Sequence, residues 1–245
     1  MSLALTHTKY ETIETFRIPI AVVGSVFFPA AAMLFFVVPN VGGMPEAATL
    51  ATGSMVTFAA MITCLFNYGA GIAERRATPW DPYVRTLPAG AGPRFAGMVL
   101  TSLIMIVLAV VPVTLIGALL TEATVTPAQF VLGLGALLLA VVPFTLMGLA
   151  IGYSLPTKAA LAVANIAFFP LAFGSGMFGD PRNMPGFVEA IAPYLPTRGA
   201  AELVWGALGQ FSPNPVSLVM FGVWVVVLGL LAAWAYRRDE GRRFS

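Results

Sequence analysis

Long apolar runs alternate with short polar connections along the whole chain. Six of these runs are close to the roughly 20 residues that a helix needs to cross the hydrocarbon core of a bilayer. They cover residues 19–38, 51–72, 95–119, 130–152, 159–178 and 215–236. None of them alternates strictly between apolar and polar residues, as a transmembrane β-strand does. The pattern therefore predicts an all-α membrane protein with six transmembrane helices, because helices satisfy their own backbone groups within the bilayer.

Composition supports the same class. Of the 245 residues 58% are hydrophobic and only 10% are charged, whereas about a quarter of the residues of a soluble globular domain are charged. The apolar runs reach from one end of the chain to the other, so we expect residues 1–245 to form a single transmembrane domain. This excludes a water-soluble fold.

Positive charge is distributed unevenly among the connections. Eleven of the 13 Lys and Arg residues fall before the first run, between runs two and three, between runs four and five, or after the last run. The connections at 39–50 and 120–129 contain none. Positively charged connections stay on the cytoplasmic side, so both termini are predicted to be cytoplasmic, in the inner (plasma) membrane of a bacterium. An even number of spans follows.

Two segments outside the apolar runs have a pattern of their own. In residues 1–18, Tyr10, Ile13 and Phe16 fall on one helical face, which predicts an amphipathic helix at the cytoplasmic interface, with a frayed tail as the alternative. Residues 179–214 are too apolar for a solvated connection, contain five prolines and are followed directly by a sixth, Pro215. They are predicted to form a re-entrant helical hairpin on the extracytoplasmic side.

Candidate chemistry in the sequence is sparse. His7 is the only histidine, no cluster has metal-ligand spacing, and the six predicted spans contain no charged residue. The only lysines, Lys9 and Lys158, do not follow the glycine pattern of a P-loop. We therefore expect a non-enzymatic subunit with no catalytic residue, no metal ligand and no cofactor in this chain. The absence of charge from the spans also argues against a proton relay.

Polar groups within the predicted spans are mostly Thr, Ser and Asn, whose simplest role is hydrogen bonding between helices. Four prolines, at 29, 112, 143 and 170, are expected to kink their helices, and Gly148 with Gly152 predicts close helix packing. A kinked bundle with aromatic walls can hold a lipophilic molecule. The candidates for such a pathway are Asn67, Asn165, Phe168, Phe169 and Phe173.

The connection at 73–93 is the longest and most charged on the predicted cytoplasmic side. It suits a surface for a partner protein, although arginines and a tryptophan at a membrane boundary also serve as topology anchors without any partner. Several sequence motifs then occur in a fixed order along nearly the whole chain. They are E-R-R at 74–76, V-R-T-L-P at 84–88, F-P-L-A-F-G-S-G-M-F at 169–178, M-P-G-F at 184–187 and I-A-P-Y-L-P at 191–196.

Together with six spans and an amphipathic first segment, these motifs resemble the permease subunits of type-2 ABC exporters, which export antibiotics, polysaccharides and lipids. The resemblance implies a lipophilic or amphipathic substrate that leaves the cytoplasm. It also implies a cytoplasmic ATPase partner that holds ATP and magnesium, a second permease protomer, identical or paralogous, and contact with membrane lipids but not with nucleic acid. It further makes 73–93 the ATPase-coupling element, through Glu74, Arg75, Arg76, Trp80, Asp81, Tyr83, Arg85 and Leu87.

The sequence departs from the family in one place, because A-T-P-W-D-P at 77–82 replaces the Gly-Thr pair that commonly follows the arginines. Two other function classes stay open. One is a membrane carrier or channel that works without an ATPase. The other is a membrane-bound enzyme or assembly scaffold, which the lack of converging titratable groups disfavours.

Overall fold

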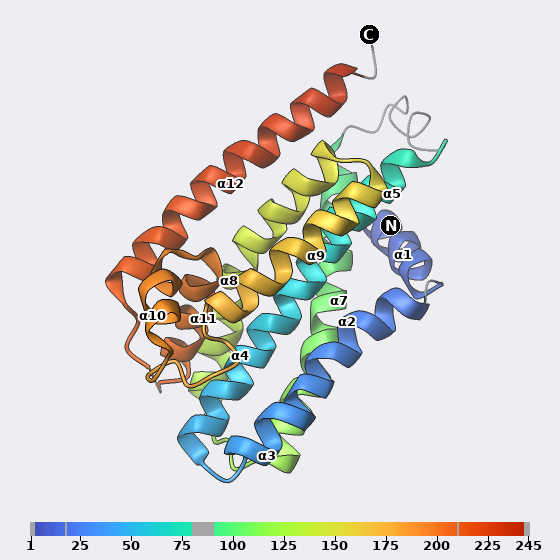
Figure 1. Cartoon of the computed structure of the whole chain (residues 1–245). Coiled ribbons are helices and arrows are strands. Elements are labelled where there is room, and N and C mark those ends of the chain that lie inside the picture. Colours follow the sequence, from blue (N-terminus) through green and yellow to red (C-terminus); the bar gives the residue numbers. More distant parts are fainter. Residues whose placement is uncertain (1–2, 18, 80–90, 210, 243–245) are drawn as a thin grey trace.

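The computed structural model describes residues 3–17, 19–79, 91–209 and 211–242, and all regular structure within these ranges is helical (Figure 1). The elements are α1 (Leu3–Phe16), α2 (Pro19–Ala32), the π-helix η1 (Met33–Val37), α3 (Val38–Val41), α4 (Pro45–Cys64), the π-helix η2 (Leu65–Ala70), α5 (Gly71–Ala77), α7 (Ala91–Leu120), α8 (Pro127–Ser154), α9 (Thr157–Gly174), α10 (Gly186–Ile191), the 3-10 helix η3 (Ala192–Tyr194), α11 (Pro196–Ala207) and α12 (Pro215–Arg242).

Within the described ranges, six helical stretches are long and apolar enough to cross a membrane, which confirms the predicted fold. They are Gly24–Val41, Pro45–Ala77, Gly92–Leu120, Pro127–Ser154, Thr157–Gly174 and Pro215–Glu240. The second is much longer than expected, because the helix starts at Pro45 and continues through the charged residues that follow Ile72. The fifth ends early at Gly174, since Gly176 has a φ of 78° that a helix cannot accommodate.

The stretch made of α4, η2 and α5 forms the centre of the bundle. Its most apolar window is 83% buried, against 17–33% for the other five. Many of its side chains are small, and the hydroxyls of Ser54, Thr57 and Thr63 donate to carbonyls one turn back on the same helix, at 2.8–3.1 Å. Thr57 and Thr63 therefore bond within their own helix and not between helices as expected, whereas Thr145 donates to Cys64 Sγ of another helix at 3.5 Å, as expected. A polar side chain can be buried here because its own helix supplies the acceptor.

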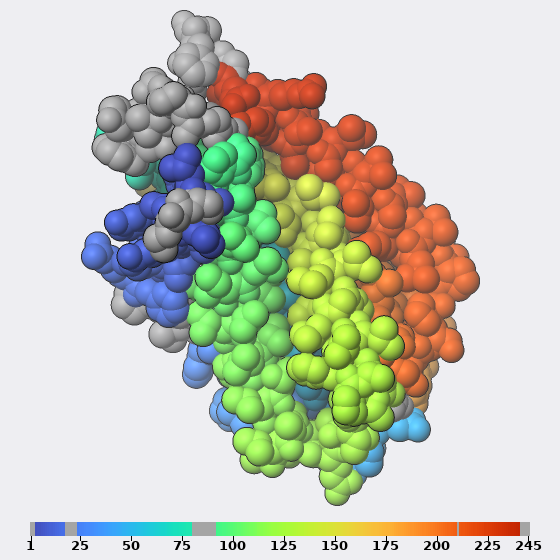
Figure 2. Space-filling view, turned by 180° about the vertical axis from the view of Figure 1, so that it is seen from behind, coloured from blue at the N-terminus to red at the C-terminus, as the bar shows by residue number. Residues whose placement is uncertain are grey.

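Close packing of α8 on this central helix depends on the predicted glycine pair. A Cβ on Gly148 would lie 2.8 Å from the Cys64 carbonyl oxygen, and one on Gly152 would overlap the carbonyl oxygen of Tyr68. Large apolar side chains instead cover the outside of the bundle. Leu139 of α8 and Leu230 of α12 are among those exposed, as suits a surface that meets lipid. Figure 2 shows the side of the bundle on which α7, α8 and α12 form the surface.

The two unusual segments are both helical. Tyr10, Ile13 and Phe16 point outward from α1, as the amphipathic pattern predicts, while the opposite side of α1 packs on α7. Residues 186–207 form the expected pair of short helices. Of these, α11 is almost entirely buried and packs against α4, α8 and α12.

Candidate functional site

A cavity of about 780 Å³ opens along one side of the central helix. Parts of α1, α2 and η1 form one wall, α9 forms the other, and the central helix and α7 lie between them (Figure 1). Its volume falls within the range of about 300–1,000 Å³ that is typical of small-molecule sites. The cavity is thus large enough for a drug-sized ligand.

Phenylalanine rings dominate the inner part of this cavity. The ring centroids of Phe58 and Phe168 are 5.2 Å apart, those of Phe58 and Phe178 are 4.9 Å apart, and those of Phe173 and Phe178 are 4.8 Å apart. Phe66 and Phe169 continue the network through Phe168. Such contacting rings provide a continuous apolar surface with π faces.

All five residues predicted for a substrate pathway line this one cavity. Three of them belong to the phenylalanine network, and Asn67 and Asn165 add amide groups to its wall. Asn165 donates to the Leu161 carbonyl oxygen at 2.9 Å on its own helix. The structure brings these residues together, and their role in transport stays a prediction.

Both π-helices contribute to the cavity wall. Phe35 and Phe36 come from η1, and Phe66 and Asn67 come from η2. A π-helical turn inserts one extra residue into a helix and is found frequently at functional sites. Here each π-helix places an aromatic residue into the cavity.

The end of the cavity next to α1 and α5 is polar. Glu11, Glu14, Glu74 and Arg75 line it, and Arg75 Nη1 lies 3.4 Å from Glu11 Oε1. Burial raises the pKa of the Glu11 carboxyl, and the guanidinium of Arg75 opposes this effect only in part. The hydroxyl of Thr101 lowers the same pKa.

The three described residues of the predicted coupling element have different surroundings. Glu74 is exposed, whereas Arg75 pairs with Glu11 and Arg76 pairs with Asp239 of α12. The other predicted coupling residues lie outside the described residues. They are Trp80, Asp81, Tyr83, Arg85 and Leu87.

Arg76 ties three helices together near one end of the bundle. Its Nε donates to Asp239 Oδ1 at 2.9 Å, and its Nη1 donates to the carbonyl oxygens of Gly152 at 2.7 Å and Leu155 at 3.2 Å. These carbonyls belong to the last turn of α8 and to the residue that follows it, where acceptors have no partner within the helix. Arg76 therefore holds α8 and α12 against α5, whether or not it also contacts a partner protein.

Replacing Asp239 with asparagine is expected to destabilise the fold by about 1.5 kcal/mol, because it removes the charge from a hydrogen bond in a site that is only 4% exposed. Unfolding in a detergent series, followed by circular dichroism, measures the change. Arg237→Gln, at an exposed position of the same helix, is the matched control and should behave as the native protein. Equal stability of the two variants would contradict the anchoring role.

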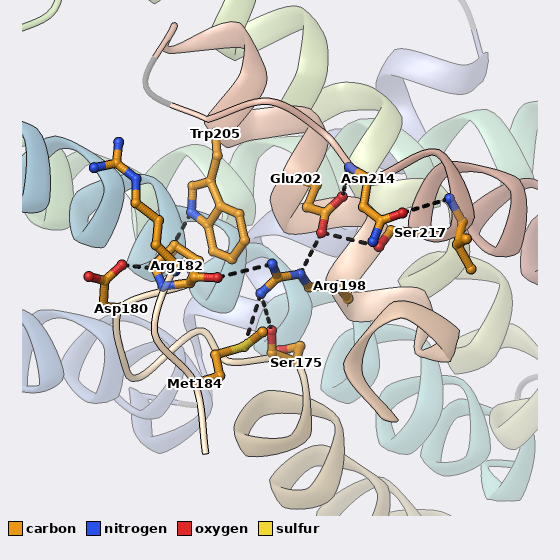
Figure 3. Close-up of polar contacts among 12 residues, drawn as sticks. Ser175, Asp180, Arg182, Met184, Arg198, Glu202, Trp205, Asn214 and Ser217 are labelled. Atoms are coloured by element: carbon orange, nitrogen blue, oxygen red, sulfur yellow. Dashed lines mark hydrogen bonds and ion pairs between the residues drawn. The ribbon is translucent and has the colours of Figure 1, made fainter. Parts of the chain in front are cut away.

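A second charged cluster, not predicted from the sequence, lies in α11 at the other end of the bundle (Figure 1), and Figure 3 shows its polar contacts. Arg198 is 4% exposed and Glu202 is 0% exposed. Arg198 Nε donates to Glu202 Oε1 at 2.6 Å, and the guanidinium stacks 4.9 Å from the centre of the Trp205 ring. The pair is thus buried within apolar surroundings.

Both members of this ion pair make further hydrogen bonds. The guanidinium also donates to the carbonyl oxygens of Ser175 at 3.2 Å and Pro181 at 3.3 Å, and the carboxylate accepts from the backbone of Asn214 at 2.7 Å and the hydroxyl of Ser217 at 3.1 Å. The acceptors and donors come from the end of α9, the 179–185 segment, the 208–214 connection and the start of α12. The pair therefore holds the whole 179–214 hairpin in place.

One signal in the sequence points to this pair. Arg198 and Glu202 are four residues apart within an apolar helical segment, and oppositely charged residues at that spacing meet on one helix face. Among the described residues, no group of three His, Cys, Asp or Glu side chains could hold a metal ion.

Among the described residues, five membrane-length helices surround a buried sixth, and an aromatic cavity opens along one side; this arrangement is typical of an α-helical membrane protein of the transporter class. Residues 3–208 match the family model described as ABC-2 type transporter, so the chain belongs to the ABC-2 type transporter family. A curated relative from Bacillus subtilis (strain 168), named "Putative transport permease YvfS", is 24% identical over 187 residues, which is 76% of each chain. The chain is a transport permease subunit.

Proposed function

We propose that this permease exports a lipophilic or amphipathic substrate from the cytoplasm as one of two protomers, identical or paralogous, and is powered by a separate cytoplasmic ATPase that binds ATP and magnesium. The observation that carries the proposal is the cavity itself. It is aromatic along most of its length and ends in charged residues of α5, next to the 78–93 segment. Because α5 lines the cavity and leads into that segment along the sequence, a partner that binds the segment would be linked to the cavity wall through α5.

The distribution of charge supports the proposed orientation in the inner membrane. Arg75, Arg76, Lys158 and Arg237 lie at the end of the bundle where α5 and the end of α12 meet, whereas Arg182 and Arg198 lie near the hairpin at the other end. With six spans both termini lie on one side (Figure 1). The positive end is cytoplasmic by the usual rule.

Copurification of an ATPase from detergent-solubilised host membranes tests the partner. Arg75 and Arg76 are unsuitable for substitution because both are paired within the chain. A variant that combines Trp80→Ala, Tyr83→Ala and Arg85→Glu changes the predicted contact surface instead. We expect the native protein to bring down an ATPase and this variant to lose it, since removal of central anchors abolishes most of the binding energy.

Glu189→Arg is the matched control, because Glu189 is exposed in α10 at the opposite end of the bundle. It should retain the ATPase. If no ATPase accompanies any of the three proteins across several mild detergents, the exporter proposal fails and the ATPase-independent carrier takes its place.

A further inference from the structure

The two ends of the cavity differ in chemistry. The inner end is formed by the phenylalanine network, from Phe58 to Phe178. The outer end, at α1 and α5, carries all the titratable residues among those that line the cavity, Glu11, Glu14, Glu74 and Arg75. A ligand that fills the cavity must therefore combine an apolar body with a polar head.

The polar end has an excess of negative charge. Three carboxylates and one guanidinium line this end, and that guanidinium, of Arg75, is already 3.4 Å from Glu11. Arg94 and His7 do not line the cavity, but they also act on Glu11 and lower the pKa of its carboxyl. Glu14 and Glu74 are both exposed. The residues that line the cavity offer no further cation to pair with these two carboxylates. They would repel an anionic head and attract a cationic one.

Glu11 adds a second, independent observation. Its Oε2 atom is buried and has no hydrogen-bond partner at bonding geometry, although Oε1 faces Arg75 and the Thr101 hydroxyl is close enough to lower the pKa of the carboxyl. A buried carboxylate oxygen without a partner is costly, since the carboxylate has lost water without a full replacement. A donor group or a positive charge placed beside it removes that cost.

The aromatic walls favour the same kind of ligand. Phe169 and Phe173 are 55% and 56% exposed, so their faces are accessible within the cavity. Cations are attracted to aromatic faces, and more strongly where water is excluded. A bulky organic cation can therefore contact phenylalanine rings along its whole length.

We propose that the cavity binds lipophilic cations, with the positive group held by Glu11, Glu14 and Glu74 and the apolar body lying against the phenylalanine network. This assignment rests on the proposed export function and names the substrate class of the same cavity. It favours cations over neutral or anionic molecules of equal size and hydrophobicity.

Two probes of matched shape and opposite charge test the preference. Tetraphenylphosphonium and tetraphenylborate both carry four phenyl rings around a central atom. Binding to the purified permease in phosphatidylcholine nanodiscs, without any ATPase, is measured by equilibrium dialysis with empty nanodiscs subtracted. We expect saturable binding of tetraphenylphosphonium and none of tetraphenylborate. Equal binding of the two probes, or no saturable binding of the cation, would overturn the assignment.

Charge removal locates the site. Glu14→Gln combined with Glu74→Gln changes two exposed residues and should leave the fold intact, while weakening cation binding at least about fivefold. Glu11→Gln should weaken it by about tenfold or more because that carboxylate is largely buried. Glu122→Gln, in the exposed 121–126 connection away from the cavity, is the control and should bind as the native protein. Unchanged affinity in the Glu14/Glu74 double variant would contradict the proposal.

An aminophospholipid headgroup is the competing occupant of the acidic end. If phosphatidylethanolamine in the nanodiscs abolishes tetraphenylphosphonium binding, the acidic end is a lipid headgroup site and the proposal is overturned. A failure of the lipophilic-cation assignment can be distinguished from a failure of the export proposal. Cation binding without an ATPase partner would remove the export proposal alone, and an ATPase partner without cation binding would remove only the substrate class.

Discussion

Replacing Glu202 with leucine is expected to lower the free energy of unfolding by about 3 to 5 kcal/mol, the usual cost of breaking a buried ion pair from one side. The change leaves the Arg198 guanidinium at 4% exposure without its carboxylate, and it removes the acceptor for Asn214 and Ser217. Because these contacts join α9, α11 and α12, the hairpin should loosen as a unit. Unfolding by increasing sodium dodecyl sulfate, followed by tryptophan fluorescence, measures the loss.

Two further variants make the result specific. Arg182→Leu breaks the surface pair with Glu46, whose side chains are 46% and 68% exposed, and should have little effect. The double variant Arg198→Met with Glu202→Leu removes both charges and should recover much of the stability that Glu202→Leu alone has lost. If the single and double variants are equally unstable, the cost comes from lost packing and not from an unpaired charge.

Replacing Gly152 with valine is expected to destabilise the bundle by about 3 kcal/mol, at the upper end of overpacking costs. The new Cβ would overlap the Tyr68 carbonyl oxygen and approach the Ile72 Cβ to 2.9 Å. Both belong to the central helix, whose backbone cannot move without disturbing the η2 wall of the cavity. Thermal unfolding monitored by size-exclusion chromatography reports the stability.

Gly135, which like Gly152 belongs to α8, provides the control, because a Cβ there would meet nothing within 4 Å. Gly135→Val should therefore leave the melting temperature close to that of the native protein. A Gly152→Val variant as stable as Gly135→Val would show that α8 can move away from the central helix at little cost.

Much of the fold follows from local sequence. Runs of apolar residues identified six helices, prolines bounded the short helices of the hairpin, and the spacing of Gly148 and Gly152 indicated where α8 packs. The candidate pathway residues were found through the same reasoning. On α9, Phe168 lies three residues and Phe169 four residues after Asn165, and Phe173 lies four residues after Phe169, so one face of a single helix carries them into the cavity.

The remaining features depend on contacts between distant residues. Arg76 and Asp239 are 163 positions apart in sequence, and Trp205 donates to Ser54 across 151 positions at 3.0 Å. No local pattern identifies such partners. The π-helices η1 and η2 were not predicted either, since a single inserted residue leaves the composition of an apolar run unchanged. The burial of α11 could not be predicted from the sequence, because the segment contains two charged residues.

The central claim is that this cavity belongs to an ATP-driven permease, and its accessibility during the ATP cycle tests that claim most directly. A variant with Asn165→Cys, on a background in which the buried Cys64 is alanine, is labelled with a membrane-impermeant maleimide in inside-out vesicles from the host. Arg237→Cys, exposed and outside the cavity, serves as control. We expect ATP with vanadate to change the labelling rate at position 165 several-fold and to leave position 237 unaffected. Identical rates at position 165 with and without ATP and vanadate would contradict the account.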